Sequence, residues 1–202
     1  MEYIVLVAKY IINEIDKLSP CDKLVIFAGV MGSGKDFQCS LLESRRYTKI
    51  AFADPLREMA WKILGWAPKN NEEYEVFKKN TIGHLGLLTF TGREFLQNLG
   101  QTMREIDPDF WCKLWQVKVD KLLKEGGKVC CSDARFFNEL SYASNCFCPS
   151  AFVFCDYVSE RYDATNKHIS EELSQYLKST GLEDLDLMDH RVLIDLVNRY
   201  VP

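Results

Sequence analysis

The chain has 202 residues, of which 47% are hydrophobic and 27% charged, and its formal net charge is −4. This is the composition of an ordinary globular protein with one substantial core, and it excludes fibrous and low-complexity classes. The acidic balance argues against a broad surface for nucleic acid polymers. We therefore expect one domain over residues 1–202.

Eight cysteines include the adjacent pair Cys130 and Cys131, which lies in a segment typical of a buried strand. An adjacent pair does not suit a disulfide framework. Cys146 and Cys148 have no matching second pair and no nearby histidine, so a zinc site is not indicated. The sequence predicts reduced thiols, buried as small hydrophobic side chains, in an intracellular, cytoplasmic protein.

The first segment, residues 1–19, has apolar residues at helical spacing, but charged residues interrupt any membrane span. The segment does not have the basic stretch followed by a small-residue cleavage site that would indicate a secretory signal. The pattern predicts an amphipathic helix that packs on the domain or on a second subunit in a homodimer. A helix on a membrane surface is the alternative.

Residues 24–36 run an apolar stretch into Gly29-x-x-x-x-Gly34-Lys35, the P-loop pattern, with Asp36 where Ser or Thr normally follows. The apolar residues 24–28 predict a central buried strand, and a helix is expected to begin after the loop. In such a loop, backbone N–H groups converge on phosphate oxygens, the helix presents its positive N-terminus, and Lys35 adds a mobile charge. A glycine-rich turn that binds nothing is the alternative.

The following elements are predicted from periodicity and turn residues. We expect a strand over 49–53, a helix over 54–66, an irregular insertion over 67–91, helices over 92–104 and 110–124, strands over 128–133 and 151–155, and a closing helix over 193–200. In the first of these helices, Asp54 is expected to be the N-cap and Pro55 to lie in the first turn.

Alternating strands and helices predict an α/β fold with a mostly parallel sheet covered on both faces. Ligands of such sheets bind beyond the carboxyl ends of the strands. The glycine-rich loop, Asp54, Asp133 and Asp156 each follow a predicted strand, so we expect them to converge at one edge. This convergence predicts an active site.

Phosphoryl transfer needs a phosphate cradle, a magnesium ion and positive side chains on donor and acceptor. Asp133, at a strand tip, is a candidate magnesium ligand, and Arg135 is placed to grip an acceptor phosphate. A surface ion pair is the alternative for these two residues. Arg57 follows the second predicted strand and could hold the acceptor phosphate from another side. Arg93 is the weaker candidate because exposed helical arginines are often only solvated.

Six sequence blocks occur in an order that resembles the deoxynucleoside monophosphate kinases of bacteriophages and other large DNA viruses. They are Ser33-Gly-Lys-Asp36, Phe52-Ala-Asp-Pro-Leu-Arg57, Thr91-Gly-Arg-Glu-Phe-Leu-Gln-Asn-Leu-Gly100, Asp107-Pro-Asp-Phe-Trp111, Ser132-Asp-Ala-Arg-Phe-Phe-Asn-Glu139 and His168-Ile-Ser-Glu171. The blocks extend over roughly residues 24–172.

The resemblance implies a P-loop NTPase-type fold with three α/β/α layers, and transfer of the ATP γ-phosphate to a deoxynucleoside monophosphate with Mg²⁺. It further implies an acceptor-binding insertion over about 58–110 and a lid over about 157–172. A viral member would act in the host cytoplasm. Lys35, Asp133 and Arg135 are the expected catalytic residues, and Asp36 and Asp133 the expected metal ligands.

The expected ATP-binding residues are Gly29, Met31, Gly32, Ser33, Gly34, Lys35, Asp36, Phe37 and Arg161. The expected acceptor-binding residues are Asp54, Arg57, Arg93, Gln97, Arg135 and Glu171. The family's loop has Asp at the place of Asp36, but usually Thr at the place of Phe37. Animal-type phosphomevalonate kinases share the Ser-Gly-Lys-Asp-Phe sequence, so a small phosphorylated acceptor is one alternative. A non-catalytic P-loop module is the other.

Overall fold

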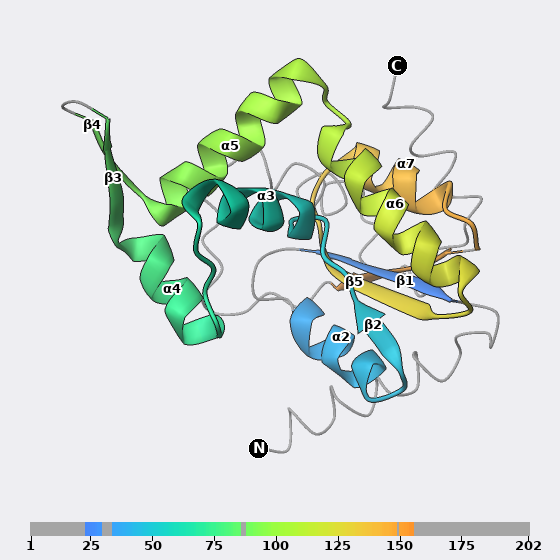
Figure 1. Cartoon of the computed structure of the whole chain (residues 1–202). Coiled ribbons are helices and arrows are strands. Elements are labelled where there is room, and N and C mark those ends of the chain that lie inside the picture. Colours follow the sequence, from blue (N-terminus) through green and yellow to red (C-terminus); the bar gives the residue numbers. More distant parts are fainter. Residues whose placement is uncertain (1–22, 30–33, 86–87, 149, 156–202) are drawn as a thin grey trace. The chain divides into compact units, whose positions relative to one another are not determined.

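The computed structural model describes residues 23–29, 34–85, 88–148 and 150–155 (Figure 1). The helices expected over 1–19 and 193–200, and the lid expected over 157–172, lie outside these residues. The described chain divides into two compact units. The first runs to Phe52 and resumes at Trp115, and the second is Ala53–Leu114.

The first unit is built on a four-stranded parallel sheet with strand order β2-β5-β1-β6. Its strands are β1 (Leu24–Gly29), β2 (Tyr47–Lys49), β5 (Lys128–Ala134) and β6 (Ser150–Cys155). All six residues of β1 are buried, and β1 pairs with a strand on each side. The predicted α/β class and the predicted central strand are therefore confirmed.

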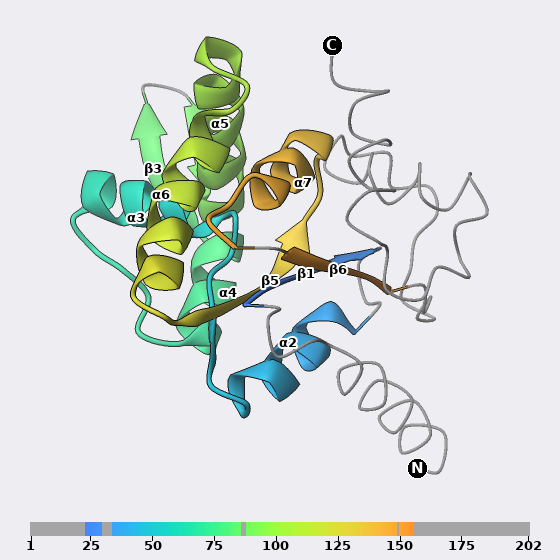
Figure 2. The ribbon, with the colours of Figure 1, turned by 90° about the vertical axis from the view of Figure 1, so that its right-hand side faces the viewer.

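Helices cover both faces of this sheet, with α2 (Lys35–Glu43) on one side and α7 (Phe137–Ser144) on the other (Figure 2). The alternation of side chains along β1 explains both layers. Val25 and Phe27 pack with Cys39 and Leu42 of α2. Leu24 and Ile26 point to the opposite face.

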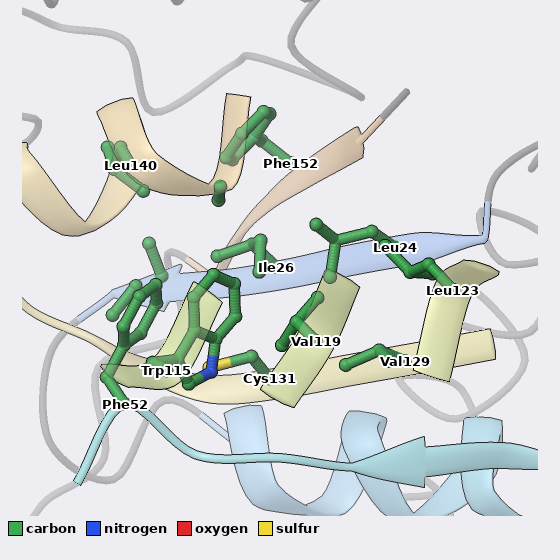
Figure 3. Close-up of a cluster of buried hydrophobic side chains, with 13 residues drawn as sticks. Leu24, Ile26, Phe52, Trp115, Val119, Leu123, Val129, Cys131, Leu140 and Phe152 are labelled. Carbon is green, nitrogen blue, oxygen red and sulfur yellow. The ribbon is translucent and has the colours of Figure 1, made fainter. Parts of the chain in front are cut away.

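That opposite face is the main core of the first unit, and Figure 3 shows its side chains. It combines Leu24 and Ile26 with Trp115, Val119 and Leu123 of α6 (Phe110–Lys124), Leu140 of α7, Val129, Cys131, Phe52 and Phe152. The Trp115 indole stacks on Phe52, with ring centroids 4.0 Å apart, and its Nε1 donates to the Ile50 carbonyl at 3.1 Å. Each fully buried large apolar side chain of this kind contributes about 1.5–3 kcal/mol.

The strand predicted over 49–53 is displaced, because β2 ends at Lys49. Ile50 still donates its N–H to the Cys130 carbonyl, but Phe52 leaves the ladder to stack on Trp115. The apolar residues that suggested a strand are therefore core residues of a turn. The hydrophobic pattern of these residues predicted their burial correctly, but it did not predict their backbone conformation.

The second unit contains α3 (Asp54–Leu64), α4 (Asn71–Lys79), β3 (Thr81–Leu85), β4 (Leu88–Thr91) and α5 (Gly92–Ile106). β3 and β4 pair as an antiparallel hairpin (Figure 1). Ala60, Phe77 and Leu96 form the buried centre of the second unit. Within the described residues, the chain thus has six helices and two sheets.

Two predictions in this unit were wrong. Most of the segment predicted to be irregular forms α4, β3 and β4, and the Asn70 side chain accepts from the Glu73 N–H at 2.9 Å and begins α4. Asp54 is not the N-cap of α3, because Ala53 occupies that position. The Asp54 carboxylate instead accepts from Arg57 Nη1 at 2.8 Å, within the first turn of the helix.

Six cysteines in the described part of the chain, all but Cys155, are free thiols, and Cys39 and Cys130 face each other across α2 and β5 with their Sγ atoms 2.9 Å apart. Burial and the neighbouring Asp120 raise the pKa of Cys146 to about 12. Among the described residues, no helix is both long enough and apolar enough to cross a bilayer.

Gly92 and Gly100 of α5 offer a matched test of packing. A Cβ on Gly92 would lie 2.4 Å from the Phe77 carbonyl oxygen, whereas one on Gly100 would have its nearest neighbours at 3.5 Å. We expect Gly92→Ala to lower the free energy of unfolding by about 1–3 kcal/mol because the neighbouring backbone must move. We expect Gly100→Ala to be neutral or to stabilise by up to about 1 kcal/mol, since Ala is the better helix former. Urea denaturation measures both, and equal effects would contradict the packing argument.

Candidate functional site

The glycine-rich loop joins the end of β1 to the start of α2. Gly34 has φ +84°, a left-handed conformation that favours glycine, immediately before the helix begins at Lys35. The Lys35 ammonium donates to the Gly29 carbonyl at 2.7 Å and so bridges the two ends of the loop. The predicted ATP-binding residues Met31, Gly32 and Ser33 lie outside the described residues.

Asp36, in the first turn of α2, joins three elements through its carboxylate. Its Oδ1 accepts from Ser132 Oγ of β5 at 2.7 Å and from Lys49 Nζ of β2 at 2.7 Å. The Asp36 side chain is nevertheless 83% exposed, whereas Ser132 is buried. We name this arrangement of Asp36, Lys49 and Ser132 the loop clasp.

Charge keeps the Asp36 carboxylate anionic. Burial acts to raise its pKa, but the hydrogen bonds from Lys49 and Ser132 and the charges of Lys49 and Lys35 outweigh burial and lower the pKa below its usual value. The same contact with Asp36 raises the pKa of Lys49 against the effect of burial. Both groups are therefore charged at neutral pH.

β5 carries an irregularity where it reaches the loop. Ile26 is paired with Cys131, but Ala28 is paired with Ala134, so Ser132 and Asp133 together lie opposite the single residue between them. This is the pattern of a β-bulge. Ser132 lies on the same face as Cys130 and reaches Asp36, whereas Asp133 lies on the face of Cys131 and reaches a different partner.

That partner is the turn after β2. Asp133 Oδ1 accepts from the Phe52 N–H at 2.8 Å, and the Cys131 thiol lies 3.2 Å from the same oxygen. Asp133 is half-buried and stands at the tip of β5, as predicted. The structure thus brings Lys35, Asp36 and Asp133 to the carboxyl ends of two adjacent parallel strands.

Arg135 is exposed and follows β5 directly. Its backbone is fixed by Glu139 of α7, whose Oε2 accepts from the Arg135 N–H at 2.6 Å and from the Phe136 N–H at 3.1 Å. The Glu139 side chain is buried. This carboxylate therefore determines where the chain presents Arg135, although sequence reasoning gave Glu139 no role.

In the second unit, Arg57 lies at a cationic and aromatic cluster. Its guanidinium is paired with Asp54 and lies 5.6 Å from the centre of the Tyr74 ring. Lys78 Nζ lies 4.8 Å from the same ring and pairs with Glu75. We name these five residues the Arg57 cluster.

Arg93 of α5 contributes to the potential at this cluster. The pKa of the Glu75 carboxyl is lowered first by its hydrogen bond with Lys78, and the charges of Lys79 and Arg93 add to that effect. Gln97 lies one helical turn after Arg93, and both side chains are exposed. Of the predicted acceptor residues of this unit, Arg93 and Gln97 are therefore exposed, whereas Asp54 and Arg57 are half-buried.

A pocket of about 660 Å³ in the second unit is a separate feature. It is lined by Leu64, Trp66, Glu72, Glu73, Val76, Phe77, Asn80, Thr81 and Ile82. Val76 is two residues from both Tyr74 and Lys78, about 200° around α4, so the pocket lies on another face of the helix from the Arg57 cluster. Its two glutamates would repel a phosphate, and we assign it no part in phosphate binding.

Several predicted site residues are not among those that the structure brings together. Arg161, Glu171 and Asp156 lie outside the described residues. Phe37 is described and is half exposed in the first turn of α2. The residues that sequence reasoning missed are Lys49, Ser132, Glu139, Tyr74 and Lys78. Ser132 and Glu139 had a signal, because they belong to the block that contains Asp133 and Arg135.

The described residues contain no group of three or more His, Cys, Asp or Glu side chains arranged to hold a metal ion. Mg²⁺ in phosphoryl-transfer enzymes is held by one or two carboxylates together with phosphate oxygens and water. The exposed Asp36 carboxylate, which lies beside Lys35 and the N-terminus of α2, could serve as one such carboxylate ligand. Comparisons with protein-family models, with curated proteins and with solved structures found no match to this chain.

Glu139→Ala tests the anchoring of Arg135. The substitution removes the acceptor of two part-buried backbone N–H groups, and an unsatisfied group costs up to about 1–3 kcal/mol when it is kept from water. We expect a clear loss in the free energy of unfolding, measured by urea denaturation at pH 7. Glu139→Gln is the control, since it keeps an acceptor oxygen and should lose less. Equal losses in the two variants would show that the hydrogen bonds to Arg135 and Phe136 do not matter.

Proposed function

We propose that this chain is an ATP-dependent deoxynucleoside monophosphate kinase with a P-loop NTPase-type, three-layer α/β/α fold. It would transfer the γ-phosphate of ATP, with Mg²⁺, to a deoxynucleoside monophosphate and give ADP and the diphosphate. The observation that carries the proposal is the Lys35 bridge to Gly29, which closes a glycine-rich loop between a buried parallel strand and a helix N-terminus.

The donor side of the proposal rests on the first unit. Lys35 supplies a positive charge at the start of α2, where the helix dipole also favours phosphate. Lys35 is held at the loop by the Gly29 carbonyl, which keeps its ammonium charge at the loop. Asp36 and Asp133 are the carboxylates available to a magnesium ion. When bound, the ion would neutralise charge on the transferring group.

The acceptor side rests on arginines, because a planar guanidinium binds a phosphate through two parallel hydrogen bonds. Arg135 is exposed at the end of β5 on a backbone fixed by Glu139. Arg57 is held in place by Asp54. The block Gly92-Arg-Glu-Phe-Leu-Gln-Asn-Leu-Gly100 resembles the nucleotide kinases more than the phosphomevalonate kinases and so favours a deoxynucleoside monophosphate as the acceptor.

A non-catalytic nucleotide-binding module is the second candidate, and the loop clasp favours it. The loop lacks the usual hydroxyl after Lys35, and the carboxylate in its place is already paired with Lys49. Such a module would bind ATP without turning it over.

A coupled assay of ADP release tests the proposal. The purified chain is supplied with ATP and Mg²⁺ and, in separate reactions, with each deoxynucleoside monophosphate or mevalonate phosphate. We expect ADP release that depends on a deoxynucleoside monophosphate. Release only with mevalonate phosphate would replace the acceptor, and ATP binding without release from any reaction would favour the non-catalytic module.

Lys35→Ala is the matched variant for this assay. We expect kcat/KM to fall by at least about 10²–10³-fold, because a fixed charge that stabilises the transition state is removed. Lys121→Ala removes an exposed lysine of α6 and is the control, with activity unchanged. Circular dichroism should show that both variants are folded. A Lys35→Ala enzyme with wild-type rates would refute the proposed site.

Arg57→Gln separates acceptor binding from ATP binding. Loss of a charge-assisted contact worth about 1.5–3 kcal/mol should raise the KM for the acceptor by about 10–100-fold. The KM for ATP should change by less than about twofold, because Arg57 is not expected to contact ATP. Lys62→Gln removes an exposed charge from the same helix and should change neither constant. Parallel rises in both KM values for Arg57→Gln would contradict the acceptor role.

A further inference from the structure

P-loop enzymes commonly hold Mg²⁺ with a hydroxyl on the loop helix and a carboxylate on a neighbouring strand. In this chain the two residue types are exchanged. The carboxylate, Asp36, is on the loop helix, and the hydroxyl, Ser132, is on β5. Asp36 Oδ1 and Ser132 Oγ are 2.7 Å apart, so the two groups form one hydrogen-bonded pair.

The alternation of side chains along β5 explains how the hydroxyl reaches this place. Cys130 packs on the α2 face of the sheet, and Cys131 lies in the core on the opposite face. By the same alternation Ser132 is directed to the loop helix, and Asp133 to the Phe52 N–H. The bulge falls at these two residues, which occupy the length of one residue on β1. Alternation therefore gives the two polar residues different tasks.

The two carboxylates differ in what they can offer a cation. Asp133 is half-buried, and its Oδ1 holds the turn at Phe52 in place. Asp36 is adjacent to Lys35 and is 83% exposed, although its Oδ1 receives two hydrogen bonds. A cation that arrives with a nucleotide at the loop therefore meets Asp36 as the more accessible carboxylate.

Lys49 offsets the cost of this exchange. A loop carboxylate adds a negative charge beside a site for anionic phosphates, and like charges at short range are unfavourable. Lys49 Nζ lies 2.7 Å from Asp36 Oδ1, and the Lys49 side chain is only 31% exposed, so the pairing is partly shielded from solvent. The ammonium cancels the added charge without occupying the loop itself.

We propose that Asp36 and Ser132 are an exchanged carboxylate–hydroxyl pair, in which Asp36 is the cation ligand at the nucleotide site and Ser132 and Lys49 are its positioning residues. This inference rests on the proposed ATP-binding function. It assigns Asp133 the role of fixing the turn after β2 rather than that of the principal cation ligand.

Mn²⁺ binding in the presence of ATP, followed by electron paramagnetic resonance, tests the pair without any need for turnover. Asp36→Asn keeps an acceptor for Ser132 and Lys49 but loses the charge, and we expect Mn²⁺ affinity to fall at least about tenfold, or about 1.4 kcal/mol. Glu43→Gln removes an exposed carboxylate from the same helix and is the control, with affinity unchanged.

The double variant Asp36→Ser, Ser132→Asp restores the common arrangement with the same total charge. We expect Asp36→Ser alone to lose Mn²⁺ affinity and the double variant to recover most of it, a rescue that a purely structural clasp would not produce. Thermal melting checks that each variant is folded. An unchanged affinity in Asp36→Asn, with a large loss in Asp133→Asn, would overturn the inference.

Titration of a fluorescent ATP analogue without metal shows whether a negative result concerns only the exchanged pair or also the proposed function. A wild-type chain that binds the analogue, but whose Mn²⁺ affinity does not depend on Asp36, overturns the exchanged pair alone. A wild-type chain that does not bind the analogue overturns the proposed function and this inference together.

Discussion

The burial of β1 on both faces is the constraint on which the first unit depends. Every residue of Leu24–Gly29 is buried, so the strand needs a hydrogen-bonded neighbour on each edge and a helical layer on each face. β5 and β6 supply the edges, and α2 lies on one face with α6 and α7 on the other. Because β1 and β5 are parallel, their carboxyl ends meet. Gly29 is thereby placed beside the tip of β5, whatever the chemistry of the loop.

The polar contacts at this edge serve both the fold and the site. The Lys35 bridge to Gly29 closes the loop, the loop clasp joins α2 to β2 and β5, and Asp133 holds the turn at Phe52. Each contact uses a charged group to fix backbone or side chains that water would otherwise solvate. Charge-assisted hydrogen bonds of this kind are stronger than neutral ones, so the edge is organised before any ligand arrives.

The sequence was sufficient where local and tertiary signals agree. The apolar run 24–28 is a strand by length and by burial, and by the same reasoning Asp133 lies at the tip of a strand. Prediction failed where packing overrides local pattern, as at Phe52, which stacks on Trp115 from 63 residues away rather than extending β2. Lys49 and Ser132 could not be singled out, because their meeting at Asp36 depends on strand order, which brings β2 and β5 side by side next to the loop helix.

The balance of charge at this edge of the sheet explains how the loop can carry a carboxylate, Asp36, in place of a hydroxyl. Next to the loop, Lys35 and Lys49 carry two positive charges, and Asp36 and Asp133 carry two negative ones; beyond the end of β5, Arg135 and Glu139 add one charge of each sign. A loop with a hydroxyl in place of Asp36 would need only Lys35 to balance Asp133, so the added carboxylate is matched by the added ammonium of Lys49. The positive end of the α2 dipole then still favours an anion at the loop. On this argument Asp36 belongs with Lys49 as a unit, and replacing either residue alone changes the net charge that a phosphate encounters.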